Sequence, residues 1–108
     1  MSAEIGIDEF AIVLGKGAAV IDVREPDEFQ PRHIAGVQPL PLSQIMDRLN
    51  ELPTKRPVYV ICEHGARSLS VADALNEMGI VAVSVEGGTS AWEVAGRPVV
   101  TDENPATK

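Results

Sequence analysis

The chain has 108 residues, a net charge of −7 at neutral pH and a single cysteine. Its length predicts one domain, which we place at residues 1–100, followed by a loose polar tail at residues 101–108. The negative charge disfavours nucleic acid as a partner, and a single cysteine excludes an internal disulfide. One cysteine and two histidines are too few for a structural zinc site, so no metal is expected.

Hydrophobic residues make up 44% of the chain, which is typical of a globular domain. No apolar run is long enough to cross a membrane, so no membrane partner is expected. The first residues lack the basic and apolar blocks of a signal peptide. These features predict a cytoplasmic protein.

The first predicted elements are a helix and a strand. A helix should begin at Ile7, where apolar residues start to recur at helical spacing, and Gly15 or Gly17 should end it. Its inward stripe comprises Ile7, Phe10, Val13 and Leu14. Residues 18–23 then predict a short buried strand that includes Asp22. A buried carboxylate needs a partner, because an unpaired buried charge is costly. The alternative is that Asp22 is a solvated loop residue.

Prolines organise the next segment. Pro26 suits the first position of a short helical turn, which Pro31 ends. Pro39 and Pro41 predict an extended segment at the edge of a sheet. Ser43 is then expected to cap a further helix. The apolar face of that helix comprises Ile45, Met46, Leu49 and Leu52.

The run Val58–Ile61 is apolar and mostly β-branched, which is typical of a strand buried in a parallel sheet. A helical period begins at Arg67, and Gly79 stands where that helix should end. The apolar stripe of this helix comprises Leu69, Ala72, Leu75 and Met78. Residues 81–85 predict another strand, and Thr89 is expected to cap the last helix. Alternating strands and helices predict an α/β fold with a mainly parallel central sheet and helices on both faces.

Cys62 lies where a strand gives way to a loop and then to a helix. The first turn of a helix has unpaired backbone N–H groups and a partial positive charge, and both stabilise an anion. A thiolate at this place should therefore be a nucleophile near neutral pH. Gly65 lets the backbone turn its N–H groups inward, and Arg67 can bind an oxyanion through two N–H groups. The alternative is that Cys62 is a small buried apolar residue.

Four segments resemble motifs of the rhodanese-like sulfurtransferases, in the same order and with similar spacing. Residues 62–68, Cys-Glu-His-Gly-Ala-Arg-Ser, resemble the active-site loop of that family. The other three segments are residues 21–29, 33–37 and 87–92. The resemblance implies a single rhodanese-like domain that carries a persulfide on Cys62 and needs no other cofactor. It also implies that Asp22, with Arg24 in the same motif, supports the active-site region.

The length of the loop separates two related chemistries. Phosphatases and arsenate reductases of similar fold have five residues between the cysteine and the arginine. Here only residues 63–66 separate Cys62 from Arg67, which is the length of the sulfurtransferase loop. An arsenate reductase would also usually need a second thiol. We therefore expect a pocket for sulfur and not for phosphate.

The predicted site comprises one catalytic residue, a substrate-binding loop and two supporting residues. These are Cys62; Glu63, His64, Gly65, Ala66, Arg67 and Ser68; and Asp22 and Arg24. The Cys62 thiolate is expected to take the outer sulfur of thiosulfate or of a persulfide and to pass it to cyanide, a thiol or a protein acceptor. Arg67 would orient a small anionic donor.

The sequence also suggests where several other side chains lie. Glu63 is expected to face outward at the pocket mouth, where its charge would weaken the binding of thiosulfate. His64 either faces solvent or tunes the thiolate. His33 is expected to be a structural hydrogen-bonding residue and Trp92 part of the core or the pocket wall. Arg32 replaces a glycine that is frequent in the family, which leaves the local backbone open.

Two other functions stay open. The domain could be a non-catalytic rhodanese-like module for binding or regulation, although such modules often lack the cysteine. It could also be a persulfide carrier that passes sulfur to one protein partner. The sequence does not separate a carrier from a free enzyme.

Overall fold

Five strands form one sheet in the computed structural model, which describes residues 2–102. The strands are β1 (Glu4–Ile5), β2 (Ala19–Asp22), β3 (Gln38–Pro39), β4 (Val58–Ile61) and β5 (Ala82–Val85). The helices are α1 (Ile7–Gly15), α2 (Pro26–Phe29), α3 (Ala66–Glu77) and α4 (Gly88–Val94). The strand order is β1-β5-β4-β2-β3, and every pair is parallel. The predicted α/β fold with a parallel sheet is confirmed.

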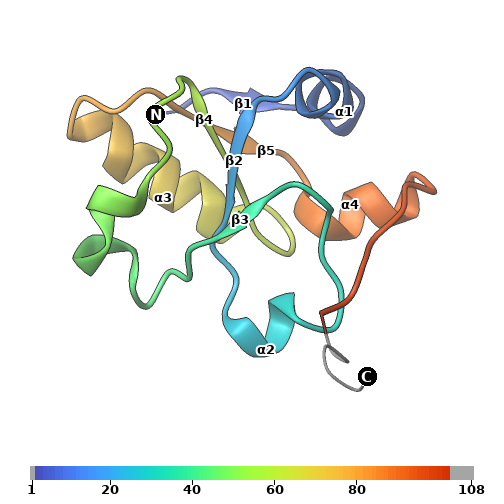
Figure 1. Cartoon of the computed structure of the whole chain (residues 1–108). Coiled ribbons are helices and arrows are strands. Elements are labelled where there is room, and N and C mark those ends of the chain that lie inside the picture. The colour runs from blue at the N-terminus through green and yellow to red at the C-terminus, as the bar shows by residue number, and fades with distance from the viewer. Residues whose placement is uncertain (1, 103–108) are drawn as a thin grey trace.

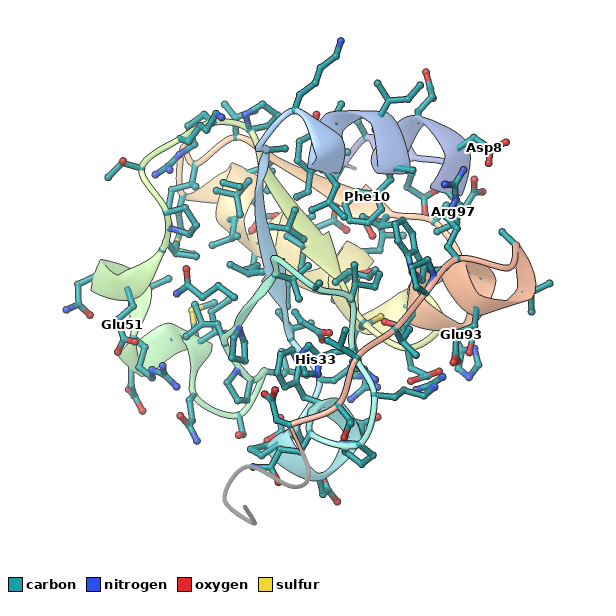
Figure 2. The ribbon with its side chains drawn as sticks, turned by 45° about the vertical axis from the view of Figure 1, so that its right-hand side comes forward. Asp8, Phe10, His33, Glu51, Glu93 and Arg97 are labelled. Carbon is teal, nitrogen blue, oxygen red and sulfur yellow. The ribbon has the colours of Figure 1, made fainter. Side chains whose placement is uncertain are left out.

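Side chains of the central strands alternate between two cores, as the pleat of a strand requires. Val60 on β4 belongs to the core that contains Leu75 of α3. The next residue, Ile61, packs in a second core with Phe10 of α1 and Trp92 of α4. Figure 1 shows α3 on one side of the sheet and α1 and α4 on the other. Figure 2 shows Phe10 beneath α1, pointing into the second core.

The sequence predicts one edge strand of the sheet but not the other. The extended edge segment that was expected at Pro39 is β3, which pairs with β2. Just beyond β3, the N–H group of Leu40 donates to the Asp22 carbonyl, so the pairing extends past the strand. At the opposite edge, β1 pairs with β5 and was not predicted. A strand of two residues is too short to show a period in the sequence.

The helix that Ser43 was expected to cap does not form. The segment contains two short 3₁₀ turns, Ile45–Asp47 and Leu49–Glu51. The Ser43 hydroxyl donates to the Glu25 carboxylate at 2.7 Å and caps nothing. Of the expected apolar face, Met46 is exposed, because a 3₁₀ turn places side chains at different angles from an α-helix.

Two further expectations about helices are wrong. Within the predicted stripe of α3, Ala72 and Leu75 are buried as expected, whereas Met78 is exposed beyond the last helical residue. Ser68 and Val71, which were not predicted, complete the buried face. Thr89 is not a cap. Gly87, with a φ of +78°, precedes α4, and Thr89 lies buried in its first turn. Two successive left-handed glycines start this helix earlier than a capping side chain would.

The predicted tail, residues 101–108, lies outside the described residues from residue 103 onward. Before that point, the N–H group of Asp102 donates to the Gln30 carbonyl at 2.8 Å. No helix in the described part of the chain is long and apolar enough to span a bilayer.

Candidate active site

Cys62 directly follows β4, and its sulfur faces the start of α3. The Sγ atom accepts backbone N–H groups from Gly65 at 3.1 Å and from Ser68 at 3.3 Å. Cys62 is only 1% exposed, so a donor must present a terminal atom to reach the sulfur. Two N–H groups directed at one sulfur favour an anion-stabilising role over apolar packing.

Two buried serines lie on the core side of the cysteine. The Cys62 thiol donates to Ser68 Oγ at 3.4 Å, and Ser68 Oγ lies 2.8 Å from Ser84 Oγ on β5. Ser68 Oγ also donates to the Gly65 carbonyl at 3.1 Å. With its proton used in that bond, Ser68 accepts from Ser84. The sequence analysis did not identify Ser84, although a serine within an apolar strand can indicate a buried hydrogen bond.

Glycines allow the active-site loop and the α4 loop to pack closely. Gly65 has a φ of +107° and immediately precedes α3, and a Cβ atom there would lie 3.1 Å from the Gly87 nitrogen. A Cβ atom on Gly88 would lie only 2.4 Å from the Cys62 carbonyl oxygen. The N–H group of Thr89 donates to that carbonyl at 2.9 Å. The last resembling motif, residues 87–92, therefore supports the loop that holds the cysteine.

Arg67 is not a free cation at the mouth of the site. Its Nη1 and Nη2 atoms donate to the two carboxylate oxygens of Glu28 at 2.8 and 2.9 Å. The hydrogen bond from Arg67 is the main reason that the pKa of Glu28 falls from 4.5 to about 2. An anionic donor would have to compete with Glu28 for this guanidinium group.

Glu63 was expected to face outward at the pocket mouth, but it is mostly buried in a network of hydrogen bonds. Its side chain is 18% exposed and accepts hydrogen bonds from Arg32, from Arg24 at 3.2 Å and from Ser90 at 2.6 Å. The bond from Arg32 is the main cause that lowers the pKa of Glu63 to about 2. Arg32 also binds Glu93 on α4 at 2.6 Å. The sequence could not predict these contacts, because Arg32 lies 31 residues from Glu63.

Asp22 and Arg24 form a buried ion pair beneath the loop, so Asp22 has the partner that its burial requires. Their side chains are 1% and 0% exposed, and Arg24 Nη2 donates to Asp22 at 3.0 Å. Arg24 also donates to the Arg32 carbonyl at 2.9 Å and to Glu63. Arg24 thus connects the end of β2 to the active-site loop.

The sequence model of the rhodanese-like domain family matches residues 7–95. This chain belongs to the rhodanese-like domain family. An archaeal member, the rhodanese-related protein from Thermoplasma volcanium, superposes with a TM-score of 0.84 and 34% identity. That match covers 91% of this chain and 97% of the archaeal chain.

Three bacterial relatives give the family match more detail. The chain is 42% identical over 76 residues to the uncharacterized protein YqhL of Bacillus subtilis, covering 69% of this chain and 60% of that protein. It is 36% identical to the thiosulfate sulfurtransferase GlpE of Pseudoalteromonas translucida, covering 84% and 89%. The putative sulfur carrier protein YrkF of Bacillus subtilis is 36% identical, but the match covers 68% of this chain and only 40% of that protein.

Three aromatic residues of this rhodanese-like domain lie as the sequence suggested. His33 is buried, stacks on Phe29 at 3.9 Å and places Nδ1 2.9 Å from the Phe29 carbonyl. Trp92 is in the core, where its indole N–H group donates to the Pro98 carbonyl. His64 is exposed, which matches the solvent-facing interpretation.

The network around Glu63 leads to a prediction about acid stability. Glu63→Gln should lower the free energy of unfolding at pH 7 by about 1–2 kcal/mol, because Arg24 and Arg32 lose a charged acceptor. The folded-state pKa of Glu63, about 2, lies below the ordinary 4.5. Its contribution is therefore complete above pH 4.5 and is lost as the pH falls toward 2. Urea unfolding of both proteins from pH 7 to pH 3 measures this difference.

Glu51→Gln is the matched control for this prediction. Glu51 forms a solvent-exposed pair with Arg48, so the same substitution should have a smaller effect there. An equal loss of stability in the two variants at pH 7, or a Glu63→Gln difference that persists undiminished at pH 3, would contradict the assignment.

Proposed function

We propose that this rhodanese-like domain is a sulfurtransferase that holds a sulfane sulfur as a persulfide on Cys62. The observation that carries the proposal is the pair of backbone N–H groups, from Gly65 and Ser68, that converge on Sγ. Such donors stabilise the thiolate before transfer and the terminal sulfur anion after it. The relatives named thiosulfate sulfurtransferase support the same reaction class.

The proposed reaction has two steps. The Cys62 thiolate attacks the outer sulfur of thiosulfate, a new S–S bond forms, and sulfite leaves with the electron pair of the broken bond. With a thiol persulfide, the leaving group is the thiolate. In the second step the acceptor attacks the terminal sulfur: cyanide becomes thiocyanate, or a thiol becomes a persulfide. Cys62 returns as a thiolate, so no oxidant or reductant is consumed.

The proposal includes the type of donor, the cofactor requirement and the cellular compartment. The four residues between Cys62 and Arg67 form a short loop, which favours a sulfur atom over a phosphate group. The covalent persulfide makes a separate cofactor unnecessary. The thiol has to stay reduced, so we propose the cytoplasm as the compartment.

A persulfide carrier is the second candidate function. The burial of Cys62 and the likeness to a putative sulfur carrier protein favour it. In that role the terminal sulfur passes to the thiol of a protein partner instead of a free acceptor. The chemistry on Cys62 is the same in both roles.

Intact mass measurement tests the proposal directly, because Cys62 is the only cysteine. Protein incubated with thiosulfate or with the persulfide of 2-mercaptoethanol should gain the mass of one sulfur atom, and cyanide should remove it as thiocyanate. Protein alkylated at Cys62 should gain nothing. Many equivalents of thiocyanate per protein indicate an enzyme, and a single slow equivalent indicates a carrier. The proposal would be overturned if neither donor loaded sulfur onto the protein.

A further inference from the structure

All three arginines that belong to the active-site loop or hydrogen-bond to it are paired with carboxylates. Arg24 binds Asp22 and Glu63, Arg32 binds Glu63 and Glu93, and Arg67 binds Glu28. Three guanidinium groups face four carboxylates, so this cluster has a net charge of −1. A site of this kind has no surplus positive charge with which to attract a dianion.

The pair between Glu28 and Arg67 is partly exposed to solvent. Both side chains are 34% exposed, whereas the pair of Asp22 and Arg24 is buried. Arg67 also directly precedes Ser68, whose backbone N–H group donates to Cys62 Sγ at 3.3 Å. A sulfonate group that binds Arg67 would therefore have to compete with Glu28 for its guanidinium group.

Glu28 is held in this position by the backbone as well as by Arg67. Its Oε1 atom accepts the N–H group of Glu25 at 3.0 Å, which closes a capping box at the start of α2. Pro26 at the first helical position fixes the same turn. The two parallel hydrogen bonds to Arg67 have the geometry in which a guanidinium group binds a planar or tetrahedral oxyanion. Glu28 thus uses the two Arg67 N–H groups that could otherwise bind a donor's oxygen atoms.

We propose that Glu28 selects the sulfur donor by occupying Arg67, so that the site accepts sulfur from thiol persulfides in preference to thiosulfate. This inference rests on the proposed sulfurtransferase function. A thiol persulfide, R–S–SH, carries at most one negative charge and has no sulfonate that needs Arg67. The Cys62 thiolate attacks its outer sulfur, the donor S–S bond breaks, and the R–S⁻ thiolate leaves and takes up the proton of the donor. Thiosulfate carries two charges and would have to displace Glu28, which would then stand unpaired beside it.

Glu28→Gln tests the selection with little change in local structure. Glutamine keeps an oxygen for the N–H group of Glu25 and removes only the charge. With thiosulfate, kcat/KM should rise on the order of tenfold at low salt, mainly through KM, and the gain should shrink as salt screens the charge. With the persulfide of 2-mercaptoethanol, kcat/KM should change by less than about twofold, because at most one charge is repelled and none needs Arg67.

Asp27→Asn is the matched control. Asp27 is the neighbouring carboxylate of α2, is exposed, and has no ion pair among the described side chains. The same loss of one charge should leave both donors within about twofold, because an exposed charge is screened by water. In an Arg67→Gln background the gain from Glu28→Gln should disappear, since it depends on releasing Arg67. Melting curves confirm that each variant is folded.

The outcomes separate this inference from the function on which it rests. If neither donor loads sulfur onto wild-type protein, the sulfurtransferase function and the inference both fail. If wild type loads sulfur but folded Glu28→Gln uses thiosulfate no better, only the selection by Glu28 fails. An equal gain in Asp27→Asn, or a gain that survives Arg67→Gln, also overturns the selection, because the effect would then be general electrostatics.

Discussion

Cys62→Ser should leave the domain folded and abolish its sulfur chemistry. Serine is close to cysteine in size, and its oxygen can accept the N–H groups of Gly65 and Ser68 that now reach Sγ. A hydroxyl group at this position is far less acidic than a thiol and cannot form a persulfide. Transfer from either donor to cyanide should fall by at least about a thousandfold, as expected when the nucleophile is removed. Intact mass should show no added sulfur.

The control for Cys62→Ser is Ser70→Ala, on an exposed position of α3 outside the contacts of the sulfur. This variant should load sulfur like the wild type. Melting curves of both proteins separate loss of the nucleophile from loss of the fold. Sulfur loading by folded Cys62→Ser at the wild-type level would mean that the covalent site lies elsewhere.

Arg24→Met should cause the largest loss of stability among single substitutions near the site. It leaves Asp22, only 1% exposed, without its guanidinium partner, and it deprives Glu63 and two backbone carbonyls of a donor. Breaking a buried ion pair from one side costs about 3–5 kcal/mol. For a domain of this size we expect the melting temperature to fall by about 15–30 °C. Thermal and urea unfolding at pH 7 measure both quantities.

Two comparisons show whether the buried pair is the cause. Asp22→Asn combined with Arg24→Met should be less destabilising than the sum of the single changes, because the double variant leaves no unpaired buried charge. Arg48→Met removes an arginine from an exposed pair with Glu51 and should have a much smaller effect. A melting temperature of Arg24→Met within a few degrees of wild type would contradict the role given to Arg24.

The sequence alone determined the features that depend on neighbours a few residues away. The apolar run of β4, the glycine before α3 and the cysteine between them follow from strand and helix periods and from the backbone freedom of glycine. These local rules place Sγ against the backbone N–H groups of Gly65 and Ser68. The number of residues from Cys62 to Arg67 is also a property of the chain itself. This part of the candidate site could therefore be predicted.

The tertiary structure alone decided which charges meet. Arg67 was expected to be available to bind an anionic donor. It instead donates hydrogen bonds to Glu28, which lies 39 residues away in sequence. Glu63 was expected to face outward at the pocket mouth. Arg32, which follows α2, instead donates hydrogen bonds to it and holds it in place. The sign of a side chain does not choose its partner when several opposite charges are available. The choice of partner depends on the parallel sheet, which brings the loops that follow β2, β4 and β5 to the same edge. No local pattern in the sequence indicates which charged residues meet there.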